Sequence, residues 1–108
     1  MPHGRPTIST HVLDTGTGRP AEGVRVTCWR LAAEPEPVGR GVTDADGRIA
    51  DLLDGGDLVA GRYRLVFDLG AGRFFEGASL DVRVEDPGRS HHVPLLVAPY
   101  GLTSYRGS

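Results

Sequence analysis

The chemistry that this sequence could perform depends first on its four histidines, which are His3, His11, His91 and His92. With an ordinary pKa of about 6.5, histidine is the side chain best suited to moving protons near neutral pH. His3 lies in a terminus that we expect to be mobile, and His11 could simply bond to its neighbours within a strand. His91 and His92 are adjacent, so they point to opposite faces of one strand, and at most one of them should share a site with His11. The residues alone do not decide which one.

Other kinds of site find less support in the residue types. A zinc site would need three or four clustered ligands, yet the sequence has no Cys-x-x-Cys, His-x-x-x-His or His-x-His. Asp44-x-Asp46-Gly47 resembles the start of a calcium loop, but its glycine is misplaced and a turn is the better interpretation. The Gly-rich segment 14–20 lacks the Gly-Lys-Ser/Thr of a phosphate loop, and Cys28 faces the predicted core. Acid–base chemistry on a bound water molecule fits these residues better.

Two further polar features have ordinary explanations when they are considered alone. Arg48 follows the turn that Gly47 closes, and an isolated loop arginine is most often a solvated surface charge. The segment 105–108 ends the sequence with polar groups, where fraying is expected. These residues by themselves indicate no more than a soluble β-sandwich.

Composition limits the architecture that must position these groups. The 108 residues correspond to one domain, 1–108, of which we expect residues 1–6 to be flexible. Gly and Pro are frequent, with 16 and 8 residues, and long helical blocks are absent, so an all-β fold is predicted. The formal charge of -2 and the scattered arginines give no indication of nucleic-acid binding. A single cysteine cannot form a disulfide within the chain, and we find neither an export signal nor a membrane-spanning segment, so we expect a cytoplasmic location.

Alternating apolar and polar residues predict short strands throughout the chain. The predicted strands cover residues 7–14, 23–30, 38–43, 63–68, 79–85, 91–98 and 101–105. We expect turns at 14–20, 44–47 and 86–88, a break at 34–37 and an irregular stretch from 48 to 60. Pro94 indicates an edge position or a bulge in its strand. Seven to eight short strands at intervals of about ten residues are typical of a two-sheet, Greek-key sandwich. A sandwich of this size would gain stability from self-association.

Several of these segments, taken in order, resemble the 5-hydroxyisourate hydrolases of the transthyretin-like family. The resemblance runs from about Thr7 to Ser108, and the closing Tyr-Arg-Gly-Ser is its most specific feature. The other segments that carry it are Ser9–Thr15, Gly18–Ala21, Thr43–Arg48, Tyr63–Asp68, His92–Leu96 and Pro99–Gly101. The resemblance implies a transthyretin-like (prealbumin-like) β-sandwich with at most one short helix.

The same resemblance implies the residues of a site. Catalytic roles fall on His11, Arg48, His92 and Ser108, and substrate contacts on His11, Arg48, Tyr105, Arg106 and Gly107. His91 falls on a position that the family leaves variable. No metal and no organic cofactor is implied.

A reaction and an assembly are implied as well. The reaction is hydrolytic opening of the six-membered ring of 5-hydroxyisourate, a small-molecule substrate, to 2-oxo-4-hydroxy-4-carboxy-5-ureidoimidazoline in urate breakdown. The implied assembly is a homotetramer, a dimer of dimers with active sites at the interface between dimers, and neither nucleic acid nor a membrane is a partner. We hypothesise that His11 or His92 acts as general base on water while Arg48 stabilises the oxyanion. Tyr105 and Ser108 would orient the ring and the water.

Two departures from the family pattern lie outside these site residues. The segment 68–79 is shorter than expected in the region of the family's one short helix, so that helix is expected to be reduced or missing. Leu102 stands where the family more often has an aromatic residue. Both departures bear on assembly or stability rather than on the proposed chemistry.

Three alternatives remain open at this level. The same sandwich could bind a small aromatic ligand without chemistry, as transthyretin does, although transthyretin lacks the Tyr-Arg-Gly-Ser ending and the histidine and arginine set. A structural, adhesion-like sandwich would be expected to carry an export signal, disulfides or a neighbouring domain. A hydrolase could also act on a related cyclic amide. A turnover assay separates binding from catalysis.

Overall fold

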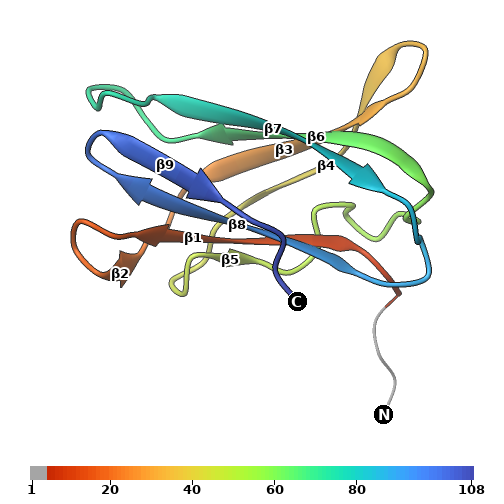
Figure 1. The fold of residues 1–108 in the computed structure, drawn as a ribbon, viewed down its shortest axis with the longest axis horizontal. Coiled ribbons are helices and arrows are strands. Elements are labelled where there is room, and N and C mark those ends of the chain that lie inside the picture. The colour runs from red at the N-terminus through yellow and green to blue at the C-terminus, as the bar shows by residue number, and fades with distance from the viewer. Residues whose placement is uncertain (1–4) are drawn as a thin grey trace.

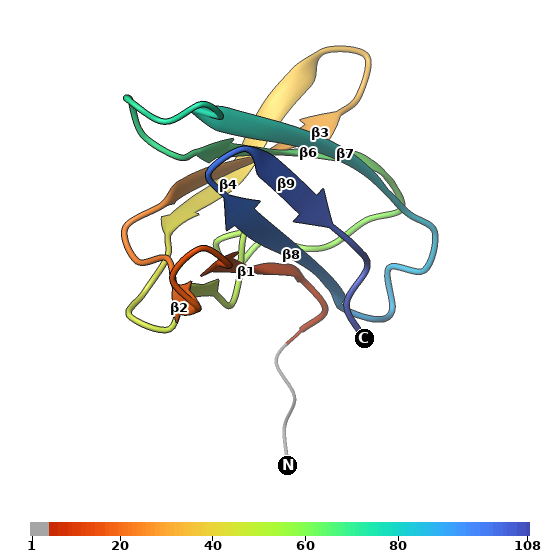
Figure 2. The same ribbon diagram turned by 60° about the vertical axis from the view of Figure 1, so that its left-hand side comes forward.

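Two β-sheets packed face to face make up the computed structural model, which describes residues 5–108 (Figures 1 and 2). One sheet has the order β2 (Arg19–Pro20), β1 (Ile8–Asp14), β8 (His91–Ala98) and β9 (Gly101–Ser104), with β5 (Arg48–Ile49) also paired to β1. The other has the order β4 (Pro35–Val42), β3 (Arg25–Leu31), β6 (Gly61–Asp68) and β7 (Gly77–Val84). The all-β, two-sheet prediction is confirmed. We call the two layers the β1/β8 sheet and the β3/β6 sheet.

Strands are the only regular elements within residues 5–108, and the seven long ones match the seven predicted segments closely. Residues 69–76, which connect β6 to β7, form turns without a helix, in keeping with the short connection noted in the sequence. The described part of the chain therefore has no helix that is long and apolar enough to cross a membrane. His3 and most of the segment 1–6, which we expected to be flexible, lie outside the described residues.

The core lies between the sheets and is filled by every second residue of the central strands. The buried side chains are Ile8, Thr10 and Val12 on β1, Val26 and Cys28 on β3, Tyr63, Leu65 and Phe67 on β6, and Val93, Leu95 and Val97 on β8. Because successive residues of a strand point to opposite faces, the residues between them point away from the core. Ser9, His11 and His92 are among those that point outward.

Cys28 occupies the core position that the alternation of β3 predicts, and it is fully buried. Loss of hydration raises the pKa of its thiol to about 12, since burial disfavours the thiolate. We expect the folded chain not to react with a coloured disulfide reagent at neutral pH, and the denatured chain to release one equivalent of chromophore. Rapid reaction of the native chain would contradict this position for Cys28.

β1 and β8 pair in parallel, whereas every other strand pair within the described residues is antiparallel. This makes β8 an interior strand, so the prediction of an edge position or bulge at Pro94 was wrong for the strand as a whole. The proline is tolerated because β9 pairs only with Leu95–Ala98, and Pro94 lies just beyond that ladder. Successive backbone nitrogens of a strand point to alternate sides. The His91 amide donates to the Thr7 carbonyl on the β1 side, so the nitrogen of Pro94, three residues later, points to the opposite side, beyond the end of β9.

The break predicted at residues 34–37 was also wrong, because Pro35 begins β4. This strand is the edge of its sheet and pairs only with β3. The proline nitrogens, which carry no hydrogen to donate, can therefore point toward solvent and not toward a partner strand. The pairing passes from Cys28 with Gly39 to Trp29 with Pro37 and skips Val38, which forms a bulge.

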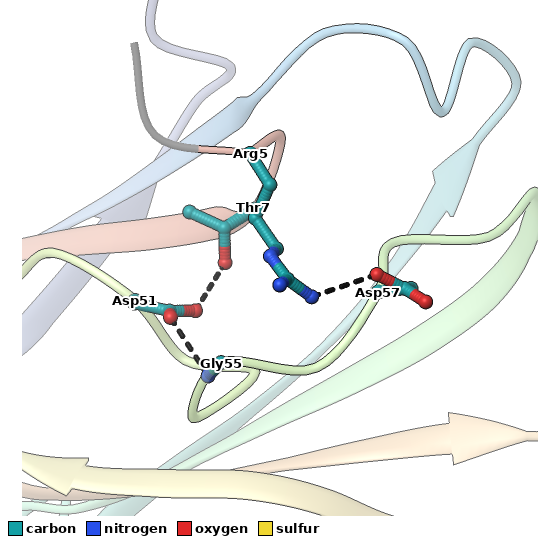
Figure 3. A network of polar contacts seen from close by, with 5 residues as sticks. All are labelled: Arg5, Thr7, Asp51, Gly55 and Asp57. Atoms are coloured by element: carbon teal, nitrogen blue, oxygen red, sulfur yellow. Dashed lines mark hydrogen bonds and ion pairs between the residues drawn. The ribbon is translucent and has the colours of Figure 1, made fainter. Parts of the chain in front are cut away.

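The stretch 48–60, expected to be irregular, begins with the two-residue strand β5. The rest of it is tied to the start of β1 by polar contacts (Figure 3). Asp51 accepts hydrogen bonds from the Thr7 hydroxyl and from the Gly55 amide, the latter at 2.9 Å. Arg5 and Asp57 form an ion pair at 2.8 Å, which is exposed and contributes little by itself. These contacts hold the chain after β5 against the strand that carries His11.

Candidate functional site

Three of the predicted site residues meet on the outward face of the β1/β8 sheet, the face opposite the core. His11 on β1 lies directly opposite Arg48 on β5, and His92 on β8 lies beside Ser9 on β1. Paired residues of neighbouring strands point to the same face, and Thr10 between them points to the core. His11 and His92 are half-buried and Arg48 is exposed. The sheet thus brings an arginine and two histidines from three separate segments onto one surface.

The turn before β5 fixes the place of Arg48. The Gly47 amide donates to the Asp44 carbonyl at 2.9 Å, and one Asp44 carboxylate oxygen accepts the amides of Asp46 at 2.9 Å and Arg48 at 3.0 Å. Gly47 has a φ of 76°, and a Cβ there would collide with the Val12 carbonyl oxygen. Glycine is therefore required at this position, and the predicted turn at 44–47 is confirmed as the element that places Arg48 against β1.

His92 has contacts on both sides. Its Nδ1 lies 2.8 Å from the hydroxyl oxygen of Ser9. Its carbonyl accepts the Gly107 amide at 2.8 Å, and the two residues form a β-bridge beyond the end of β9. Figure 1 shows the C-terminal tail leaving β9 and passing over β8 at this point. The last residues of the chain are thereby placed beside the His92 side chain.

The surroundings of His92 disfavour its protonated form. Burial lowers the pKa of its imidazole, and the positive charges of Arg48 and His11 lower that pKa further. Both residues act on the His92 ring from the same outward face of the sheet. The lowered pKa favours the neutral imidazole, which is the form that can accept a proton.

A titration of His92 tests this electrostatic coupling. We expect its imidazole to titrate below the ordinary value for histidine, and we expect Arg48→Gln to raise the pKa only part of the way back, since burial remains. Nitrogen-15 and proton NMR of the imidazole, followed against pH, measures both values. An unchanged pKa in Arg48→Gln would place the guanidinium too far away to act on His92.

The residues of the tail are placed less closely. Tyr105, Arg106 and Ser108 are exposed, and no hydrogen bond of their side chains is found within residues 5–108. Tyr105 and Arg106 line a cavity of about 590 Å³ together with His92. Its other walls are residues 80–83 of β7, the chain after it, the start of β8 and Ser104 at the end of β9.

This cavity shares only His92 with the three predicted site residues of the outward face. It includes Leu80 and Val82 of β7 and His91 and Val93 of β8, so it opens between the two sheets, and it includes neither His11 nor Arg48. The Nδ1 atom of His91 is buried there without a hydrogen-bond partner among the described residues. His91 and His92 thus point to opposite faces, as their adjacency predicts, and only His92 shares the face of His11.

Chemically, the outward face combines a neutral imidazole with a permanent cation. A neutral imidazole can take a proton from water, and a guanidinium can stabilise an oxyanion that forms nearby. Within residues 5–108 no group of three or more His, Cys, Asp or Glu side chains gathers in a way that could hold a metal ion.

Ser9 was not among the predicted site residues. The signal that could have identified it is its spacing, because Ser9 and His11 are two positions apart on one strand and must share a face. Its contact with His92 could not be read from the sequence, since it depends on the parallel register of β1 and β8.

Comparison with known proteins finds similarity over nearly the whole chain. The HIUase/Transthyretin family matches residues 8–107. The chain is 40% identical over 114 residues to 5-hydroxyisourate hydrolase 2 of Rhizobium meliloti (strain 1021), an alignment that covers 94% of this chain and 95% of that relative. It superimposes on 5-hydroxyisourate hydrolase of Klebsiella pneumoniae with a TM-score of 0.82 at 39% identity, covering 95% of this chain and 99% of the other. Sea bream transthyretin in complex with thyroxine gives a TM-score of 0.82 at 28% identity, covering 93% of each chain.

Proposed function

This chain belongs to the HIUase/Transthyretin family, and from that premise we propose that it opens the ring of 5-hydroxyisourate by metal-free acid–base catalysis at His11, Arg48 and His92. The reaction itself, hydrolysis of 5-hydroxyisourate in urate degradation, follows from relatives of that name that are about 40% identical over nearly the full length of both chains. The observation that carries the proposed chemistry is the meeting of the three side chains on one face.

The proposed reaction begins with a water molecule bound at this face. The oxygen of this water molecule attacks a carbonyl carbon of the ring amide, and one of the two histidines accepts a proton from the water at the same time. Arg48 stabilises the negative charge that develops on the carbonyl oxygen, and its forked, permanently charged guanidinium suits that role better than a lysine would. The carbon–nitrogen bond then breaks, and the protonated histidine returns its proton to the leaving nitrogen. The product is 2-oxo-4-hydroxy-4-carboxy-5-ureidoimidazoline.

The tail is proposed to complete the site. Tyr105, Arg106 and Gly107 would contact the substrate, and Ser108 would orient it together with the water, which is a positioning contribution. The bridge between Gly107 and His92 supports this, because it brings the tail to the edge of the outward face.

We further propose that the active unit is a homotetramer, a dimer of dimers, in the cytoplasm. The catalytic side chains lie on a sheet face rather than in a closed pocket, so a second subunit facing them would be needed to exclude water. Among the described residues, β7 and β9 are the last strands of their sheets on the same side of the sandwich, and each has one edge without a paired strand. Light scattering coupled to size-exclusion chromatography measures the number of subunits. A monomer that turns over substrate would contradict the proposal that the tetramer is the active unit.

The experiment that tests the function follows the decay of freshly made 5-hydroxyisourate, generated from urate by urate oxidase, through its ultraviolet absorbance. We expect the purified chain to accelerate the decay in proportion to its concentration. A folded tetramer that leaves the decay unchanged would instead support the alternative, a binding module for a small aromatic ligand. That alternative is favoured only by the structural similarity to transthyretin in complex with thyroxine, and calorimetry with an aromatic ligand would test it.

A further inference from the structure

We propose that Ser9 and Gly107 are positioning residues that hold the His92 ring from its two sides and leave Nε2 as the basic atom of the site. This inference rests on the proposed hydrolysis, and it goes beyond it by choosing between the two histidines and between the two nitrogens of one ring. Neither Ser9 nor the backbone of Gly107 has to touch substrate for it to hold.

Ser9 acts on one side of the ring. Its hydroxyl oxygen lies 2.8 Å from Nδ1 of His92, and the two residues are direct neighbours in the parallel register of β1 and β8. We infer that Nδ1 carries the proton and donates it to the Ser9 oxygen. The Ser9 hydroxyl can donate or accept, and in the tautomer that we infer, with Nδ1 as the donor, the lone pair lies on Nε2.

Gly107 closes the opposite side of the ring. A Cβ at residue 107 would lie 2.5 Å from Cδ2 of His92, 3.1 Å from its Cγ and 3.2 Å from its Cβ. A Cβ contact of 2.5 Å is essentially never observed, so a side chain at residue 107 would force the His92 ring or the tail to move. The Gly107 amide also donates to the His92 carbonyl at 2.8 Å, which holds the tail in place. Glycine is required here for close approach to a side chain rather than for a positive φ.

The two contacts together determine the direction of the ring. Nδ1 and Cδ2 flank Cγ, so Ser9 and Gly107 grip the two sides of the imidazole next to its attachment point. Cε1 and Nε2 remain at the free end, and no hydrogen bond of Nε2 is found within residues 5–108. In a ring held in this way the rotamer and the tautomer are already fixed when Nε2 meets a water molecule. Little further conformational entropy is therefore lost in reaching the reactive arrangement.

The first test measures the tautomer directly, without substrate. In the wild-type chain labelled with nitrogen-15 histidine, at a pH where His92 is neutral, we expect a pyrrole-type signal for Nδ1 and a pyridine-type signal for Nε2. The reverse pattern would overturn the proposal. Because this readout needs no turnover, its failure can be distinguished from failure of the proposed hydrolysis, which the decay assay alone decides.

The second test uses variants. Ser9→Ala should lower kcat about tenfold with little change in KM, since one hydrogen bond is lost, and it should give mixed tautomer signals for His92. Ser9→Thr keeps the hydroxyl and should restore both. Ser79→Ala, on β7 in the other sheet, is the matched control and should match the wild type.

Gly107→Ala should lower kcat by a similar or larger factor and shift the His92 ring signals, because the added methyl group displaces the ring. Its control is Gly101→Ala, where a Cβ meets only the Ala98 methyl at 4.0 Å. Circular dichroism confirms that each variant is folded. Wild-type kcat and wild-type ring signals in folded Ser9→Ala and Gly107→Ala would overturn the proposal.

Discussion

Replacing His92 with asparagine is expected to lower kcat for 5-hydroxyisourate at least about a hundredfold while leaving the fold and the assembly intact. A general acid–base group contributes about that much or more. Asparagine has a polar atom close to the position of Nδ1, so it can keep the contact with Ser9, but it has nothing at the position of Nε2. The loss of kcat can therefore be attributed to the missing Nε2 atom and not to a rearranged sheet. Initial rates from ultraviolet absorbance, together with circular dichroism and light scattering, measure these quantities.

The control for this variant is its neighbour in the sequence. His91→Asn removes an imidazole whose Nδ1 has no hydrogen-bond partner among the described residues and which faces the other side of β8. We expect its kcat and KM to remain close to the wild-type values. If His91 proved essential and His92 dispensable, the assignment of the reacting face to the outer side of β8 would be wrong.

Arg48→Gln is expected to lower kcat/KM by at least about a hundredfold as well, because it removes the cation that stabilises the developing oxyanion. The turn that carries residue 48 should survive, since Asp44 binds the amide of Arg48 and not its guanidinium. Arg48→Lys keeps the charge without the forked donors and should recover only part of the loss. Steady-state rates for both variants, measured with the same assay, give the comparison.

Arg40→Gln provides the control for removal of an arginine as such. Arg40 is exposed on β4, in the β3/β6 sheet, and it should tolerate glutamine without loss of activity. Full activity in Arg48→Gln would remove the arginine from the mechanism and leave the histidines to act without an oxyanion partner.

Much of this architecture could be predicted from local sequence patterns. The alternation that gives β1, β6 and β8 is driven by burial of one face, and burial is visible in the residue types themselves. The turn at 44–47 is equally local, because one aspartate and one glycine specify it. Cys28 could be assigned to the core on the same grounds, since Val24 and Val26 precede it on the same face of the strand.

The errors arose where the outcome depends on partners rather than on the segment itself. Pro35 lies in a strand because β4 is an edge, and Pro94 lies in an interior strand because β9 stops one residue short of it. β2 and β5 have only two residues each, too few for any alternation to be recognised. Sequence spacing contains no information on any of these neighbours.

The same limit applies to the site. That His11 and His92 share a face follows from the alternation once the two strands are known to be neighbours, and the family resemblance supplied that knowledge. The contacts of Ser9 and Gly107 with the His92 ring depend on register at the level of single residues. No periodicity specifies such a register, so these two contacts emerged only from the structure.

The parallel pairing of β1 with β8 also has a consequence for how the protein is made. Ser9 and His92 are 83 positions apart, and the whole β3/β6 sheet is synthesised between them. While the chain emerges from the ribosome, β1 cannot pair with β8 until residues 91–98 have been added. Pairings of such long sequence separation form slowly, because a large loop must close first. Nascent chains should therefore acquire catalytic competence only after β8 has been synthesised, and until then chaperones would meet β1 with an uncovered edge.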